Sequence, residues 1–260
     1  SKKKKPAQRF GKKPILLPLT PEESIDVNWP EDLALAETIA AGHRATENLA
    51  LQALAPYLGA AMLSDITREM GLTCALPRAL RPTAGTRLFG RAKTLELAAL
   101  AAGEDWRGIY SALRSYAFVR PGDVVMVKNN VADRAYFGNL NAQLAMRAGA
   151  VGAVIDGLTR DSGAVETLRF PVFARGSYAV DIKFEGTVRS MNRPIDIGGV
   201  KVENGDYVFA DNDGVIAIAA RHWPQVRKRV LEGIDREWRI GRMAAIGADP
   251  EAILHQLGDF

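Results

Sequence analysis

Residues 86–174 switch repeatedly between a two-residue and a near-helical spacing of apolar positions, which predicts alternating strands and helices. The expected elements, in order, are a strand within 86–100, a helix over about 105–117, a strand over 124–127, a helix that begins after Gly138, a strand over 153–155, a helix over about 162–168 and a strand over 171–174. The short apolar strands are typical of strands buried on both faces. This order implies right-handed crossovers and a parallel core, so we expect an α/β domain.

The flanking segments follow other patterns. Pro14, Pro18, Pro21 and Pro30 disfavour helix and predict an irregular arm over residues 1–30. Helices are expected over 31–54, from Ser64-Asp65 to Gly71, and over 224–240, and short strands with turns at Asn204-Gly205 and Asp213-Gly214 are expected after residue 181. No internal repeat or linker divides the rest. We therefore predict an arm over 1–30 and a single domain over 31–260.

Composition and charge exclude several classes. Hydrophobic residues make up 47% of the 260 and charged residues 25%, as in folded proteins. The net charge of +4 is local, because residues 1–13 hold seven Lys or Arg and no acid, and the remainder is mildly acidic. We expect this tail to be a solvated or partner-docking extension and expect no binding of nucleic acid. No apolar run approaches the roughly 18–20 residues that a membrane span needs.

Cysteine and histidine offer little for catalysis. Cys74 stands alone, so no internal disulfide forms and a reducing cytoplasm is the expected compartment. We interpret it as a buried structural thiol. His43, His222 and His255 are scattered, and the Gly-rich phosphate loop, the serine elbow and the His-Glu-x-x-His motif are absent from the sequence. The chemistry therefore points to carboxylates, arginine, backbone amides and a metal.

Two short segments combine these groups. Gly138-Asn139-Leu140-Asn141 opens a predicted helix, whose free backbone amides form an anion site. Arg160-Asp161 follows the next predicted strand, and a crossover returns it to the same edge of the sheet. Arginine grips a carboxylate through paired hydrogen bonds, and an aspartate oxygen suits Mg²⁺ or Mn²⁺. Taken alone, an ordinary helix start and an ordinary exposed charge pair also fit these residues.

At these segments the sequence resembles the RraA-like proteins, which include the 4-hydroxy-4-methyl-2-oxoglutarate and 4-carboxy-4-hydroxy-2-oxoadipate aldolases and the regulator of ribonuclease E activity. The matching residues are Pro121-Gly122-Asp123-Val124-Val125, Gly138 with Ala142, Ala145, Gly149 and Gly152, residues 154–161 (Val-Ile-Asp-Gly-Leu-Thr-Arg-Asp), residues 170–176 (Phe-Pro-Val-Phe-Ala-Arg-Gly), Gly198-Gly199-Val200, Gly205-Asp206 and residues 210–215 (Ala-Asp-Asn-Asp-Gly-Val). Ser64-Asp65 and residues 88–92 agree more loosely, and the resemblance covers about 60–220.

The resemblance implies a three-layer swivelling β/β/α domain that assembles as a homotrimer or a dimer of trimers. It also implies that Gly138, Asn139, Leu140 and Asn141 bind a 2-oxo acid, that Arg160 binds its carboxylate and acts in catalysis, and that Asp161 holds the metal. Two departures concern the substrate, because Asn139 stands where an acid is common and Ser162-Gly163-Ala164 offers no acid. Glu166, Asp181 and Glu185 are further candidates for the metal shell.

The activity so implied is that of a divalent-metal-dependent lyase. It would cleave a carbon–carbon bond of a 4-hydroxy-2-oxo acid, or decarboxylate oxaloacetate, through a pyruvate enolate stabilised by Mg²⁺ or Mn²⁺. Three alternatives stay open. One is a non-catalytic regulator that binds a ribonuclease or another protein, the second is a hydratase or dehydratase that uses the same site, and the third is a structural oligomer with a vestigial site.

Overall fold

The computed structural model describes residues 15 and 17–258, and the chain divides into two compact units, Ser1–Glu47 and Asn48–Phe260. The helices are α1 (Pro30–Leu54), which runs across the division, η1 (Ala55–Tyr57), α2 (Ala60–Glu69), η2 (Trp106–Phe118), α3 (Asn139–Arg147), α4 (Ser162–Thr167), η3 (Ala220–His222), α5 (Trp223–Ala245) and α6 (Pro250–Leu257). The strands are β1 (Arg81–Ala84), β2 (Leu88–Ala99), β3 (Asp123–Asn129), β4 (Ala135–Phe137), β5 (Gly152–Thr159), β6 (Val172–Ser177), β7 (Gly186–Met191), β8 (Ile195–Ile197), β9 (Val200–Val202), β10 (Tyr207–Ala210) and β11 (Val215–Ile218).

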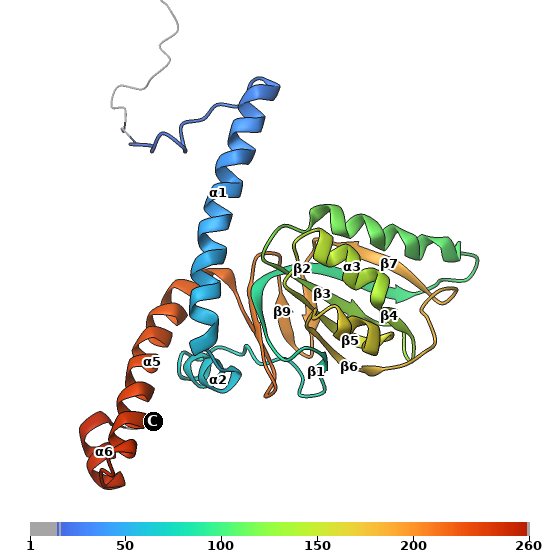
Figure 1. The fold of residues 1–260 in the computed structure, drawn as a ribbon. Helices are drawn as coiled ribbons and strands as arrows, with labels where there is room; N and C mark the ends of the chain where they lie inside the picture. The colour runs from blue at the N-terminus through green and yellow to red at the C-terminus, as the bar shows by residue number, and fades with distance from the viewer. Residues whose placement is uncertain (1–14, 16, 259–260) are drawn as a thin grey trace, which may run out of the picture. The chain divides into compact units, whose positions relative to one another are not determined.

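Nine strands of the second unit form one mixed sheet (Figure 1). Its main path is β1-β6-β5-β3-β2-β10-β11, with β4 paired to β5 and β7 paired to β2. The pairs β2–β3, β3–β5, β5–β6 and β4–β5 are parallel, as the alternating pattern predicts, and the outer pairs are antiparallel. The carboxyl ends of β4, β5 and β6 therefore meet at one edge.

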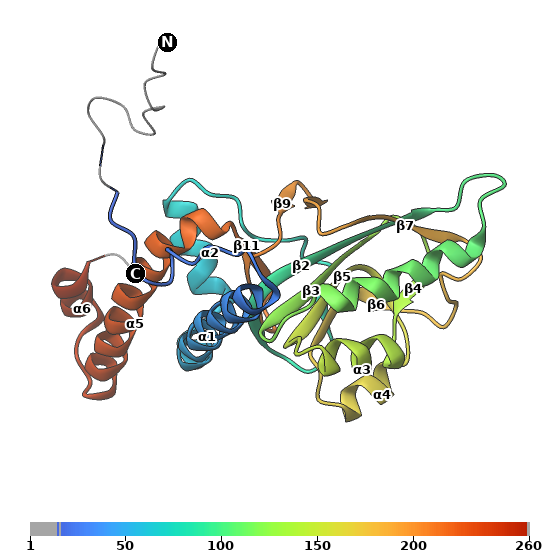
Figure 2. The ribbon, with the colours of Figure 1, turned by 90° about the horizontal axis from the view of Figure 1, so that it is seen from above.

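The sheet separates two apolar cores. On one face, residues of η2, α3 and α4 pack against alternate positions of the parallel strands, such as Val125, Val127 and Ile155. The intervening positions, such as Met126 and Val154, face the small antiparallel sheet β8–β9. Figure 2 shows α3 and α4 on one side of the strands and β9 on the other. This is the three-layer β/β/α arrangement that the family resemblance implied.

Most predicted elements are present. The helix after Gly138 ends before Gly149, whose φ of +93° suits glycine. Three points need correction. Helix α2 begins at Ala60, ahead of the predicted start at Ser64-Asp65. Residues 106–118 form a 3₁₀ helix instead of an α-helix, and α6 was missed. The turns predicted at Asn204-Gly205 and Asp213-Gly214 are both present, and only the second closes a hairpin, between β10 and β11.

A third core holds the ends of the second unit together. Leu63 of α2 and Val226 and Val230 of α5 pack with Phe209 of β10, and Cys74 is buried among them. In the first unit, the carboxylate of Asp32 accepts hydrogen bonds from the backbone N–H groups of Asn28 and Trp29 and so closes the start of α1.

The remaining predictions about the ends of the chain stand as they were made. The basic residues 1–13 lie outside the described residues, and the boundary at residue 30 stays a prediction. In the described part of the chain, no single helix is long and apolar enough to cross a membrane, and one bent pair, Pro30–Tyr57 with Ala60–Glu69, passes on length and composition only.

Candidate functional site

The pairing of β4 with β5 brings the two predicted segments together. Phe137, the last residue of β4, is in register with Thr159, the last residue of β5. The carbonyl of Phe137 accepts a hydrogen bond from the backbone N–H of Arg160 at 2.8 Å and another from the Thr159 hydroxyl at 2.6 Å. Gly138 and Arg160, 22 residues apart in the chain, therefore leave the sheet side by side.

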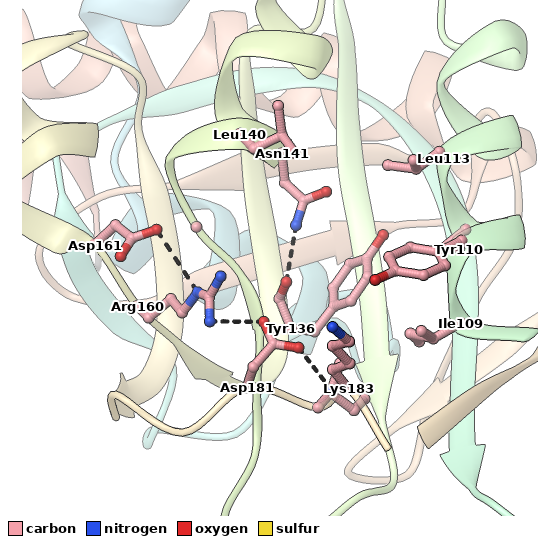
Figure 3. A pocket seen from close by; sticks show the side chains of 13 residues that line it. Ile109, Tyr110, Leu113, Tyr136, Leu140, Asn141, Arg160, Asp161, Asp181 and Lys183 are labelled. Atoms are coloured by element: carbon pink, nitrogen blue, oxygen red, sulfur yellow. Dashed lines mark hydrogen bonds and ion pairs between the residues drawn. The ribbon is translucent and has the colours of Figure 1, made fainter. Parts of the chain in front are cut away.

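A pocket of about 380 Å³ opens at this edge (Figure 3). One side is polar and is formed by the start of α3 and by the loops that follow β5 and β6. The other side is apolar and belongs mainly to η2. The lining residues are Ile109, Tyr110, Ala112, Leu113, Tyr136, Gly138, Leu140, Asn141, Arg160, Asp161, Asp181, Ile182 and Lys183.

The guanidinium of Arg160 lies between two carboxylates (Figure 3). Its Nη1 is 2.7 Å from Asp181 Oδ2, and its Nε is 3.7 Å from Asp161 Oδ2. Asp181 is itself fixed, because its Oδ1 accepts a hydrogen bond from the backbone N–H of Lys183 at 2.6 Å. Asp181 thus orients Arg160 through Nη1, and neither of these two ion pairs uses Nη2.

Asp161 connects the arginine to the start of α3. Its Oδ2 also accepts a hydrogen bond from the backbone N–H of Asn139 at 3.2 Å. Its backbone is left-handed, with φ +55°, a conformation that aspartate tolerates better than most residues. Gly138 fits closely against it, since a Cβ at Gly138 would lie 2.6 Å from Asp161 Oδ2.

The start of α3 supplies donors for an anion. The N–H of Asn139 is taken by Asp161, and the first intrahelical bond runs from Ala142 to Gly138. Among the described residues no acceptor faces the N–H groups of Leu140 and Asn141, as is usual in a first helical turn. These donors and the helix dipole favour a carboxylate in the pocket.

The carboxylates of the pocket suit a cation that binds few protein ligands and keeps most of its waters. Within residues 15 and 17–258 no three His, Cys, Asp or Glu side chains gather closely enough to hold a metal. Asp161 makes both of its contacts through Oδ2, so Oδ1 faces no partner among these residues. Mg²⁺ and Mn²⁺ suit such a site, because Mg²⁺ commonly binds one or two carboxylates and keeps several waters.

Five of the six predicted site residues line the pocket, and Asn139 joins them through its backbone contact with Asp161. Of the three further acids, only Asp181 lines the pocket. Glu166 instead accepts a hydrogen bond from the backbone N–H of Gly85, and Glu185 pairs with Arg134. None of the histidines lines the pocket.

Sequence reasoning missed Tyr110, Tyr136 and Lys183. Tyr136 stands one residue before the end of β4, at the same sheet edge as Gly138, and a prediction of β4 would have placed it there. Tyr110 and Lys183 reach the pocket from η2 and from the loop after β6, and their spacing in the chain carries no comparable signal.

The mixed sheet defines an α/β protein with a charged pocket at the carboxyl edge of its parallel strands, where such folds commonly bind ligands. The family model described as aldolase/RraA matches residues 60–217, which is more than half of the chain. The chain therefore belongs to the RraA-like family, as its motifs indicated.

Individual relatives agree with this assignment. A protein of Halalkalibacterium halodurans named "Putative 4-hydroxy-4-methyl-2-oxoglutarate aldolase" is 32% identical over 65% of this chain and 80% of its own length. Protein DlpA of Legionella pneumophila is 26% identical over 74% of this chain and 31% of its own length.

Solved structures share the fold. An uncharacterized protein from Pseudomonas syringae pv. tomato has a TM-score of 0.70 at 24% identity and covers 79% of this chain and 94% of its own. Streptomyces coelicolor RraAS2, described as an unusual member of the RNase ES inhibitor RraA protein family, has a TM-score of 0.63 at 23% identity, with coverages of 74% and 95%.

Proposed function

We propose that the protein is a divalent-metal-dependent lyase that cleaves a carbon–carbon bond of a 4-hydroxy-2-oxo acid or of oxaloacetate. One observation carries the proposal. A guanidinium, a carboxylate with a free oxygen and the open N–H groups of a helix start line one pocket of a size suited to a small acid. The name of the Halalkalibacterium halodurans relative supports the same chemistry.

Different residues of the pocket would bind the substrate, hold the metal and exclude water. Arg160 and the N–H groups of Leu140 and Asn141 would bind the carboxylate of the 2-oxo acid, and Asp181 would keep the guanidinium in place. Asp161 would hold Mg²⁺ or Mn²⁺, which supplies Lewis-acid stabilisation of negative charge on the 2-oxo oxygen. Leu113 and Tyr110 of η2 would exclude water from the far side of the acid.

The reaction breaks the C3–C4 bond of the acid. The bonding electrons stay on the three-carbon fragment, which becomes pyruvate after it takes up a proton. The other fragment leaves as a carbonyl compound when the 4-hydroxyl loses its proton, or as carbon dioxide in the case of oxaloacetate. Arg160 acts by preorganised positive charge near the carboxylate, a contribution often worth about 10²–10³ in rate.

Turnover by the purified chain tests the proposal. Pyruvate release from oxaloacetate and from 4-hydroxy-4-methyl-2-oxoglutarate would be measured with Mg²⁺, with Mn²⁺ and with EDTA. We expect EDTA to abolish the activity and Arg160→Ala to lower kcat/KM by about 10²–10³. Arg239→Ala is a matched control, because Arg239 pairs with Asp235 on α5 and does not line the pocket.

Three results would contradict the proposal. These are turnover that resists EDTA, turnover that survives Arg160→Ala, and no turnover of either acid. The last would favour the interpretation as a regulator of a ribonuclease. Release of water without cleavage would favour a dehydratase.

We also propose that the chain assembles in the cytoplasm as a homotrimer or a dimer of trimers. Support comes from the large apolar side chains at the pocket, since Tyr110, Leu113 and Leu140 are 50%, 42% and 64% exposed in the isolated chain. Apolar groups gathered in this way are typical of contact surfaces. Light scattering of the purified protein would give the number of subunits, and a monomer would contradict the proposed assembly.

A further inference from the structure

Tyr136 places a buried hydroxyl at the pocket without giving it a partner. The residue is 6% exposed, lies in the middle of β4 and lines the pocket. Its hydroxyl oxygen has less than 1 Å² exposed and no hydrogen-bond partner in the described chain. The neighbouring Tyr116 hydroxyl donates to Asn141 Oδ1 at 3.1 Å, and it also lies close enough to the Tyr136 hydroxyl to affect its pKa.

An unpartnered buried hydroxyl is unfavourable in the folded protein. It loses its hydrogen bonds to water on folding, which costs about 1–3 kcal/mol when nothing replaces them. Phenylalanine would fill the same space in β4 without that cost. In the described chain only the Tyr116 hydroxyl lies beside it, without a well-formed hydrogen bond, so a better placed acceptor would stabilise the Tyr136 hydroxyl.

The surroundings indicate what the acceptor is. The backbone of Tyr136 is tied to the anion-binding segment, because its carbonyl accepts a hydrogen bond from Asn141 Nδ2 at 2.8 Å. The next residue, Phe137, holds the backbone of Arg160. Tyr136 thus sits on the same rigid frame as the groups that face the acid.

The hydroxyl is suited to donate to an anion. Burial raises the pKa of Tyr136 well above that of a free tyrosine, and the nearby Tyr116 hydroxyl only partly offsets this. The phenol therefore stays neutral and protonated, and it meets a carboxylate or 2-oxo oxygen as a donor without repulsion. Hydrogen bonds to charged acceptors are stronger than those between neutral groups.

We infer that Tyr136 is a substrate-binding residue whose hydroxyl donates a hydrogen bond to an oxygen of the bound 2-oxo acid. This inference rests on the proposed function and assigns a further contact at the same site. Because the hydroxyl is sealed from water, the acid reaches it only by displacing side chains of the pocket wall. Tyr110 and Leu113, which line the pocket from η2, are 50% and 42% exposed and are the side chains we expect to be displaced.

Two single-atom variants separate binding from stability. Tyr136→Phe removes a hydroxyl that has no partner in the free protein, so Tm should stay equal or rise. Its Kd for pyruvate, measured by calorimetry with Mg²⁺ present, should increase roughly tenfold, and the rise in Tm on adding pyruvate should shrink. Tyr116→Phe is the matched control, because loss of its bond to Asn141 should lower Tm in the free protein.

The inference is overturned if Tyr136→Phe binds pyruvate as tightly as the unmodified chain. It is also overturned if this variant loses as much Tm as Tyr116→Phe, because the hydroxyl would then have a protein partner. Pyruvate binding by Arg160→Ala distinguishes failure of the role proposed for Tyr136 from failure of the proposed function. Lost pyruvate binding in Arg160→Ala with unchanged binding in Tyr136→Phe removes only the role of Tyr136, whereas unchanged binding in both removes the proposed function.

Discussion

At the scale of single residues, the absence of a side chain at Gly138 is as important as the charges around it. Gly138 has an extended backbone, so its requirement comes from space and not from a left-handed conformation. A methyl group there would meet Asp161 Oδ2 at 2.6 Å and Arg160 Cγ at 3.0 Å. The glycine thus lets the carboxylate, the guanidinium and the helix start approach one another.

We therefore expect Gly138→Ala to lower kcat/KM by at least tenfold while the protein stays folded, because Asp161 and Arg160 must shift by several tenths of an ångström. Gly241→Ala on α5 is the control, since its Cβ would meet nothing within 4 Å and should only strengthen the helix by about 0.5–1 kcal/mol. Steady-state kinetics and thermal melting would measure both effects. Equal kcat/KM for the two variants would contradict the spatial argument.

At the scale of elements, the sequence predicted those parts whose apolar spacing matches their burial. The run 124–127 lies in β3, which has a core on each face, and the helix after Gly138 presents Ala142 and Ala145 to one core. Prediction from apolar spacing failed where that spacing does not determine the type of helix or is too short to reveal a strand. Residues 106–118 have a helical period but tighten into a 3₁₀ helix, and β4 has only three residues.

The candidate site also contains residues that the sequence could place and residues that it could not. Gly138, Arg160 and Asp161 follow strands, so topology alone places them at one edge. Asp181 and Lys183 arrive from a loop whose path depends on tertiary contacts, such as the hydrogen bonds between residues 180–182 and Ala135. The spacing of residues along the sequence does not reveal such tertiary contacts.

The apolar wall on η2 leads to a prediction at this scale. Leu113→Ala should enlarge the pocket without unfolding the protein, because Leu113 is half exposed. We expect kcat/KM to shift severalfold towards the bulkier of two 2-oxo acids, with little change in the Kd for pyruvate. Competition assays with oxaloacetate and a longer 4-hydroxy acid would measure the shift. An unchanged ratio would show that η2 does not contact the substrate.

At the scale of the whole molecule, Cys74 reports on the core between α2, α5 and the strands β10 and β11. Burial raises the pKa of its thiol, and the nearby Asp206 adds to this while a hydrogen bond with Thr67 opposes it. The reactive form is the thiolate, so raising the pH through the usual thiol range near 8.5 should barely increase reactivity in the folded protein.

We expect a thiol reagent at pH 8 to label the native protein at least a hundredfold more slowly than the protein unfolded in guanidinium. The labelling rate should rise along the unfolding curve measured by circular dichroism. Rapid, complete labelling under native conditions would mean that this core opens independently of the rest.

The backbone bonds between β4 and β5 have a broader consequence for how such a protein diversifies. They fasten the groups that would recognise the acid head, whereas the wall that would meet the remainder of the molecule belongs to η2, a separate helix with half-exposed side chains. Recognition of the pyruvoyl end of the substrate and preference for the rest of the substrate could then change independently of each other. A chimera that carries residues 105–119 of another member of the family should acquire that member's preference for the part of the substrate beyond the pyruvoyl group. It should keep its own affinity for pyruvate.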